Sequence, residues 1–221
     1  MKFYVLENPK VGPGDGDAVT DYLYVDGSKL GDAPQCPVCG KYLGGMPLLP
    51  PIRLELKAWG SRWGDVAFFG GDQILVSNRL RDLFVEAGLS GFTRFDPAEL
   101  VKISRRKKRV GSPPNYQLAS IQRGRALVDD AASGLERNEP STCDECRSAG
   151  IRRTDRIVLE ANTWSGEDVF HARGLPGTIL ASERFKRLCD DHDLANCCLV
   201  PAEDYHFDFY PHERPTPSSL H

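Results

Sequence analysis

Apolar and charged residues alternate along residues 52–57, which read Ile-Arg-Leu-Glu-Leu-Lys. A period of two puts the apolar side chains on one face, so the pattern predicts a strand with one buried side. Residues 157–161, Ile-Val-Leu-Glu-Ala, are its expected counterpart later in the chain. Apolar runs around residues 3–6, 22–25 and 116–121 predict further strands, the last of which would cross between the two halves of the chain.

Two helices are predicted where the apolar spacing changes from every second residue to every third or fourth. Ser77 and Ser182 each follow an apolar run and stand where an N-cap hydroxyl accepts a hydrogen bond from the first free helix amides. Gly88 is expected to end the first helix. The apolar faces predicted to lie in the core are Leu80, Leu83, Phe84 and Ala87 in the first helix, and Phe185, Leu188 and Cys189 in the second.

These features recur in the same order in the two halves. Residues 74–83 match residues 179–188 without a gap, and the triplet Pro-Ala-Glu follows both matched segments. The sequence therefore predicts an α+β protein of two diverged repeats, each with strands and one helix. The predicted divisions are an N-terminal repeat at 1–103, a connector at 104–140, a C-terminal repeat at 141–210 and a disordered tail at 211–221, which is rich in proline and small polar residues.

Composition and charge are those of an ordinary globular protein. Of the 221 residues, 40% are hydrophobic and 27% are charged, and the net charge is −3. This balance argues against a protein that coats nucleic acid or membranes. Glu7 and Pro9 break the N-terminal apolar run, which argues against a cleaved signal peptide. No apolar stretch approaches the roughly 20 residues that span a bilayer, so we expect a soluble, cytoplasmic protein.

Four of the seven cysteines form two Cys-X-X-Cys pairs, Cys36 with Cys39 and Cys143 with Cys146. In a reducing compartment such pairs are typical of metal ligands. A structural zinc site needs four ligands, which two pairs supply. Gly40 follows the first pair and permits a tight turn whose amides can bond the sulfurs, whereas Arg147 stands at that position after the second pair. We predict one structural zinc ion per chain, bound by all four cysteines in a zinc-ribbon-like site that bridges the two repeats.

Other interpretations of the cysteines stay open. The two pairs can be separate dithiols, or a redox pair of the thioredoxin kind, for which a βαβ pattern is expected. Cys189 and His192 have a Cys-X-X-His spacing that can complete a metal site with either pair. A buried core cysteine followed by surface residues explains this second spacing more simply.

No set of residues in the sequence predicts catalysis. Ser77 and Ser182 are explained as helix caps, and the Gly-rich residues 69–72 lack the lysine and the serine or threonine of a phosphate-binding loop. We therefore expect a protein that is not an enzyme.

One dense basic run, Arg105-Arg106-Lys107-Lys108-Arg109, offers an alternative function. Together with a zinc fold it is compatible with a regulatory protein that binds nucleic acid through residues 105–109. The aromatic and polar residues expected to contact bases are not interleaved with the run, so a solvated connector is the preferred interpretation and nucleic acid is not the expected partner.

The duplicated cysteine pairs, residues 164–170 (Trp-Ser-Gly-Glu-Asp-Val-Phe), residues 175–180 and residues 182–186 resemble the double-CXXCG motif proteins of myxobacteria. The resemblance covers about residues 1–210. That family is associated with immunity proteins of swarming-inhibition toxin systems. The resemblance therefore implies a zinc-binding immunity protein that neutralises a cognate protein toxin in the cytoplasm by stoichiometric binding.

The family's cysteine pairs correspond to Cys36, Cys39, Cys143 and Cys146 of this chain, with Arg147 departing from the second glycine. Aromatic residues near the C-terminus are candidate anchors for a partner, although two of them, Phe207 and Phe209, equally fit an edge strand. These candidate anchors are Tyr205, Phe207, Phe209 and Tyr210.

Overall fold

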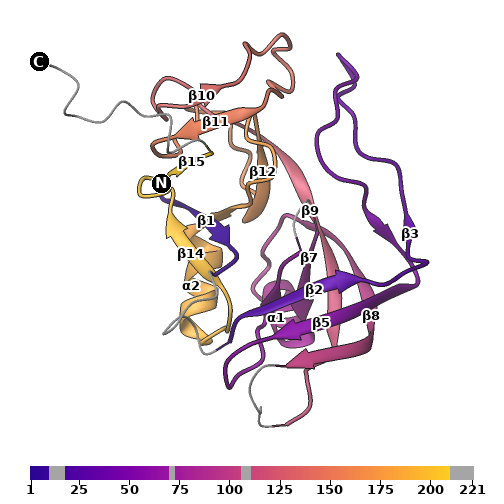
Figure 1. The fold of residues 1–221 in the computed structure, drawn as a ribbon. Coiled ribbons are helices and arrows are strands. Elements are labelled where there is room, and N and C mark those ends of the chain that lie inside the picture. Colours follow the sequence, from indigo (N-terminus) through magenta and orange to yellow (C-terminus); the bar gives the residue numbers. More distant parts are fainter. Residues whose placement is uncertain (10–17, 70–72, 106–110, 210–221) are drawn as a thin grey trace, which may run out of the picture.

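Strands dominate the structure, a computed structural model that describes residues 1–9, 18–69, 73–105 and 111–209. Strands and β-bridges make up 41% of these residues, whereas helices make up 9%. The predicted α+β fold of two repeats is therefore wrong, because strands of both halves share one curled, mixed sheet (Figure 1). Each strand has hydrogen-bonding groups along both edges, and strands of the other half satisfy many of them.

Ten of the described strands form this large sheet. They are β1 (Phe3–Glu7), β2 (Thr20–Tyr24), β5 (Ile52–Ala58), β6 (Val66–Ala67), β7 (Gln73–Ser77), β8 (Phe92–Arg105), β9 (Tyr116–Leu127), β12 (Val169–Arg173), β13 (Leu180–Ser182) and β14 (Cys198–Pro201). Their order is β14-β1-β13-β12-β9-β8-β5-β2, with β6 paired to β7 and β7 paired to β9. Most neighbours are antiparallel, but β5 is parallel to β8 and β12 is parallel to β9.

Strand β9 joins the two halves of the chain. Its first residues pair with β7, where Tyr116 lies opposite Ser77, and also with β8 on the other edge. Its later residues pair with β12, where Gln122 lies opposite Phe170. The strand predicted at residues 116–121 is thus confirmed, and its buried side chains place it at the centre of the sheet.

The strand predicted from alternation at residues 52–57 is confirmed as β5. Its side chains alternate as expected, with Ile52, Leu54 and Leu56 buried in one hydrophobic cluster and Arg53 exposed. Strands β1 and β2 confirm the two shorter predictions near the N-terminus.

The strand predicted at residues 157–161 is wrong. Leu159 forms only an isolated bridge with Val128. The backbone amide of Val158 donates instead to the Ser133 hydroxyl at 2.9 Å, so a neighbouring loop takes the place of a partner strand. Ile157 is still buried, which explains the apolar pattern.

Both predicted helices are confirmed. Helix α1 (Asn78–Glu86) is capped by the Ser77 hydroxyl, and helix α2 (Glu183–Asp191) is capped by the Ser182 hydroxyl. The helices pack together in one hydrophobic cluster, with the rings of Phe84 and Phe185 6.1 Å apart. Ala87 departs from the prediction: it is the exposed C-cap of α1, one residue before Gly88. None of the described helices is long and apolar enough to cross a membrane.

Two small sheets stand apart from the large one. The first is formed by β10 (Glu136–Arg137), β11 (Ile151–Thr154) and β15 (Phe207–Asp208). The second, formed by β3 (Lys29–Leu30) and β4 (Leu48–Leu49), is the base of an arm that carries the first cysteine pair. Figure 1 shows this arm on the right, rising beside the sheet toward the level of β10 and β11. The two cysteine-bearing segments thus meet above β9 and β12. The residue boundaries proposed for the repeats and the connector stay predictions.

Candidate metal centre

The four predicted cysteines come together although they lie in opposite halves of the sequence. All four sulfur atoms lie within 4.8 Å of one another. The sulfurs of Cys36 and Cys143 are 3.9 Å apart, and those of Cys39 and Cys146 are 3.7 Å apart. Four sulfurs bound tetrahedrally at about 2.3 Å from a zinc ion would lie about 3.8 Å from each other. The arrangement is therefore compatible with a zinc site.

Backbone geometry turns the first pair inward. Gly40 has a φ of +73° and its amide donates to the Cys36 carbonyl at 2.9 Å, which closes the tight turn expected there. The amide of Cys36 in turn donates to the carbonyl of Lys41 at 2.9 Å. Cys36 is buried and Cys39 is exposed, so the centre lies at the surface with one side covered.

The second pair forms the same turn without a glycine. Arg147 adopts a left-handed φ of +46°, and its amide donates to the Cys143 carbonyl at 2.9 Å. The amide of Ser148 donates to the Cys146 sulfur at 3.4 Å. The Arg147 guanidinium pairs with the Glu160 carboxylate at 2.7 Å. Its positive charge is therefore shared between that carboxylate and the nearby cysteine thiolates.

Within the cysteine centre, two thiols have shifted pKa values, and the shifts have opposite directions. The backbone amide of Cys39, assisted by that of Val38, lowers the pKa of Cys36 to about 7, because both amides stabilise the thiolate. Burial raises the pKa of Cys146 to about 12. Such an unequal set is expected where buried thiols are crowded together, and a divalent cation would stabilise all of them as thiolates.

Direct contacts join the two pairs. The Lys41 ammonium donates to the Ser148 carbonyl at 3.5 Å and lies 3.6 Å from the Glu139 carboxylate. The Ser148 hydroxyl donates to the Tyr42 carbonyl at 3.4 Å. These contacts are long and partly exposed, so they add to the cysteine centre in joining the arm to the second cysteine segment.

A buried arginine fixes the second cysteine segment to the rest of the fold. The Arg137 side chain is 6% exposed and forms two hydrogen bonds of 2.7 Å with the Asp130 carboxylate. It also donates to the carbonyls of Ala149 and Gly174. Nothing in the local pattern around Arg137 predicts this role, because its partners lie 7, 12 and 37 residues away and are brought to it by the fold.

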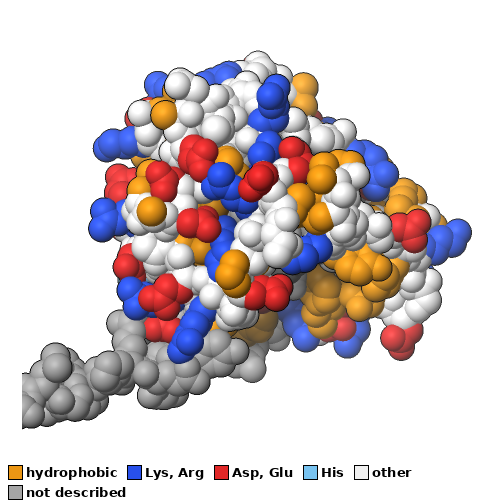
Figure 2. Space-filling view, turned by 90° about the horizontal axis from the view of Figure 1, so that it is seen from above, with side chains coloured by type: hydrophobic (Ala, Val, Ile, Leu, Met, Phe, Trp, Pro, Cys, Tyr) orange, Lys and Arg blue, Asp and Glu red, His pale blue; other side chains and the backbone are white. Residues whose placement is uncertain are grey.

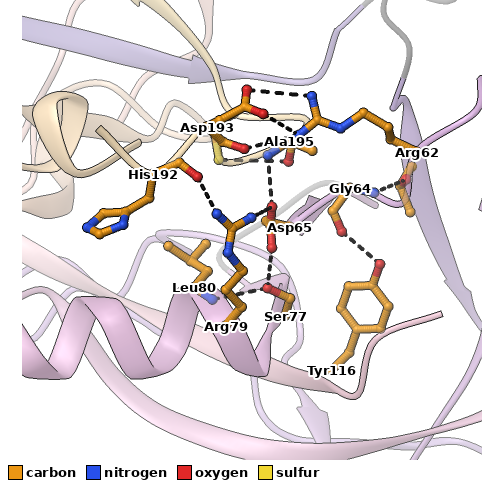
Figure 3. Close-up of polar contacts among 12 residues, drawn as sticks. Arg62, Gly64, Asp65, Ser77, Arg79, Leu80, Tyr116, His192, Asp193 and Ala195 are labelled. Atoms are coloured by element: carbon orange, nitrogen blue, oxygen red, sulfur yellow. Dashed lines mark hydrogen bonds and ion pairs between the residues drawn. The ribbon is translucent and has the colours of Figure 1, made fainter. Parts of the chain in front are cut away.

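Two aspartates make matching contacts in the two halves. Asp65 accepts hydrogen bonds from the Ser77 hydroxyl at 2.6 Å and from the Ala195 amide at 2.8 Å, and it pairs with Arg79 at 3.4 Å (Figure 3). The Arg79 guanidinium also donates to the carbonyl of His192, the C-cap of α2.

Asp168 repeats this pattern with the halves exchanged. It accepts from the Ser182 hydroxyl at 2.6 Å and from the Ser90 amide at 3.0 Å, and it pairs with Arg184 at 3.2 Å. Arg184 donates to the carbonyl of Ala87, the C-cap of α1. Each aspartate therefore links the helix start of its own half to the segment after the helix of the other half. The sequence places an aspartate before each capping serine, but not the cross-connection.

The competing ligands do not join the cysteine centre. Cys189 is buried in the core between the helices, and His192 is the exposed C-cap of α2. Among the described residues, the four cysteines alone form a group able to hold a metal ion.

The candidate anchors near the C-terminus have mixed exposure. Tyr205 and Phe207 are half-buried, and Phe207 lies in the edge strand β15. Phe209 is 67% exposed and contacts Phe207 with ring centroids 5.1 Å apart. Tyr210 lies outside the described residues.

The predicted basic run is only partly within the described structure. Arg105 ends β8, and its guanidinium lies over the Trp63 ring at 5.8 Å. Residues 106–109 lie outside the described residues.

A group of arginines beside the cysteines was not expected from the sequence. Arg123, Arg125 and Arg173 line a cavity together with Cys36 and Cys146. Their signal in the sequence is two arginines separated by one glycine, which is too common to single out a site.

The protein is thus rich in β-structure, with a cysteine centre at its surface and matching aspartate contacts between its two halves. Residues 50–204 match the model of the immunity protein family Imm11. This span covers well over half of the chain, so the protein belongs to that family. It includes the second cysteine pair but begins after the first. No curated protein that was compared with the chain matches it.

Proposed function

We propose that this protein neutralises a cognate toxin in the cytoplasm by binding it stoichiometrically, without catalysis. The observation that carries the proposal is the match of residues 50–204 to an immunity protein family. The narrower likeness to the double-CXXCG proteins of myxobacteria points the same way. In such a mechanism the affinity comes from a few central contacts, and the on-rate is helped by charge.

We further propose that zinc bound by Cys36, Cys39, Cys143 and Cys146 is structural. Supporting this role, all four sulfurs lie within 4.8 Å of one another, and two of the sulfur–sulfur distances, 3.9 and 3.7 Å, match those around a tetrahedral zinc ion. When bound, zinc would supply cohesion between the arm and the second cysteine segment. The chain's own groups hold that geometry through the amides at Cys39 and Ser148 and the turns at Gly40 and Arg147.

The role in immunity is tested with a toxin encoded next to this gene. Expressing that toxin alone should arrest cell growth, and co-expressing this protein should restore growth in proportion to its amount. The purified pair should elute as a complex of fixed stoichiometry and leave the toxin chemically unchanged on mass spectrometry. Rescue without a complex, or with a modified toxin, would contradict stoichiometric binding.

The alternative function is nucleic-acid binding through the basic run at residues 105–109. It predicts a mobility shift of DNA or RNA that weakens with salt and disappears when residues 105–109 are neutralised. Of this run the structure describes Arg105 alone, which is exposed and whose guanidinium lies over the Trp63 ring at 5.8 Å.

A further inference from the structure

A cavity of about 320 Å³ lies between the two cysteine segments and the strands β9 and β12. Cys36 and Leu43 of the arm form part of one wall, and Cys146 and Ser148 of the second segment form another. The remaining wall is the surface of the sheet. The volume is at the lower end of the range of small-molecule sites.

Arginines from two adjacent strands line the sheet side of the cavity. Arg123 and Arg125 are two positions apart on β9, so they project from the same face of the sheet. Arg173 comes from the end of the neighbouring β12, where it lies opposite Leu127 of β9. The pairing of these strands is what brings the three guanidinium groups to one wall.

The positive charge on this wall exceeds the negative charge supplied by carboxylates. Glu145 is the one acidic residue among the described residues that line the cavity, and it lies 3.6 Å from Arg173. The Nε of Arg173 is buried and has no hydrogen-bond partner among the described residues. Arg125 is exposed and forms no ion pair within the described part of the chain.

Figure 2 shows the molecule from above, the side on which the arm and the second cysteine segment lie. Basic and acidic side chains are interspersed over most of this face, and hydrophobic ones gather on one flank. The arginines of the cavity lie beside apolar lining residues such as Leu43 and Pro37.

We propose that this cavity binds a small ligand through an oxyanion, either a phosphate or a carboxylate, held by Arg125 and Arg173. The planar guanidinium group presents parallel N–H donors that match two oxygens of either anion. The apolar wall at Leu43 and Pro37 would contact the uncharged part of the ligand. This site is separate from the proposed toxin-binding role and does not depend on it.

Isothermal titration of the full-length, zinc-loaded protein with inorganic phosphate and with succinate tests the proposal. Ionic strength is held constant with sodium chloride, so that general screening does not differ between the arms. Saturable binding at one site is expected for at least one anion. Binding of phosphate alone identifies a phosphate ligand, and binding of succinate alone identifies a carboxylate ligand.

Substitutions connect the binding to the cavity. Arg125→Gln should weaken the affinity for the anion roughly tenfold or more, because a charge-assisted hydrogen bond is lost. Arg125→Lys should recover part of that loss, since charge remains but the fork does not. Arg53→Gln is the matched control: Arg53 is an exposed arginine on β5, paired with Glu99, and it should leave binding unchanged.

Two results would overturn the proposal. One is the absence of saturable binding of either anion to the wild-type protein. The other is an Arg125→Gln variant that binds the anion normally but holds less zinc, which would mean that the arginine balances the charge of the cysteine centre. Zinc content measured before and after each titration separates these outcomes. Because Arg125 is exposed, its substitution should leave the fold intact.

Discussion

Arg147 occupies a backbone conformation that usually favours glycine. Its φ is +46°, whereas the corresponding residue of the first cysteine turn is Gly40 with a φ of +73°. A residue with a β-carbon pays roughly 1 kcal/mol or more in this region. The Arg147–Glu160 ion pair, 2.7 Å long and partly exposed, offsets part of that cost, because such pairs contribute up to about 1 kcal/mol.

Two substitutions separate the backbone cost from the ion pair. Arg147→Ala loses the pair and keeps the strained φ, whereas Arg147→Gly loses the pair and relieves the strain. We therefore expect the glycine variant to be more stable than the alanine variant by about 1 kcal/mol. Urea unfolding of both variants, zinc-loaded and at one pH, measures the difference. Equal stabilities, or a more stable alanine variant, would show that the turn carries no strain.

At the scale of elements, the close approach of the segment before β8 to strand β12 depends on a single glycine. Gly91 precedes β8 with a φ of +114°, and a β-carbon there would lie 1.8 Å from the Val169 carbonyl oxygen. The obstacle is the backbone of β12, which cannot move aside without breaking the pairing of β12 with β9 and β13.

Gly91→Ala should therefore destabilise the protein strongly, by at least about 3 kcal/mol. Gly88→Ala is the matched control, because Gly88 also has a positive φ, +60°, but nothing lies within 4 Å of its added β-carbon. That control should cost only about 1–2 kcal/mol. Thermal and urea unfolding of the two variants provide the comparison. A Gly91 variant no less stable than the Gly88 variant would argue against this packing.

Elements with a local signal were predictable from the sequence. The capping serines Ser77 and Ser182 and the apolar positions after them located both helices, and strict alternation located β5. The strand predicted at residues 157–161 was wrong because burial of Ile157 produces an apolar pattern whether the backbone pairs with a strand or with a loop. Local patterns also give no pairing partners. The matched segments therefore predicted separate repeats, whereas β9 pairs with strands of both halves.

The site shows the same division between local and long-range information. The spacing of the cysteines predicted which four side chains would gather, because Cys-X-X-Cys geometry is set by one turn. Arg137, which supports the second turn, was not predictable because Asp130, Ala149 and Gly174 reach it only through the fold. The cavity arginines depend in the same way on the pairing of β9 with β12.

At the scale of the whole molecule, the described parts of the two halves are connected by strand pairing, by side chains and by the cysteine centre. Strand β9 pairs with strands of both halves, and β1 pairs with β13 and β14. The exchanged contacts of Asp65 and Asp168 join the helices, and the cysteine centre joins the outer segments. Buried hydrophobic clusters lie under the first two connections. At the cysteine centre Leu43 is the one partly buried hydrophobic residue packed against the buried cysteines among the described residues. The outer segments therefore depend on the centre more than the sheet does.

Loss of zinc should consequently loosen both cysteine segments and leave the large sheet folded. Protein purified without added metal should contain about one zinc per chain by elemental analysis. Removing the ion with a chelator should speed amide hydrogen exchange in the turn of Cys36–Gly40 and in that of Cys143–Arg147. Amides of β5 and β9, which pair within the sheet, should keep their protection.

Cys36→Ser and Cys143→Ser should each reproduce the loosening of both turns, because one ion bound by all four sulfurs cannot hold either segment without the other. Cys198→Ser, at a half-buried cysteine of β14 outside the centre, is the control and should retain zinc and protection. Loosening confined to the substituted turn would indicate two separate dithiols. Wild-type protein without zinc, with the cysteines cycling between thiol and disulfide, would instead support redox chemistry at this centre.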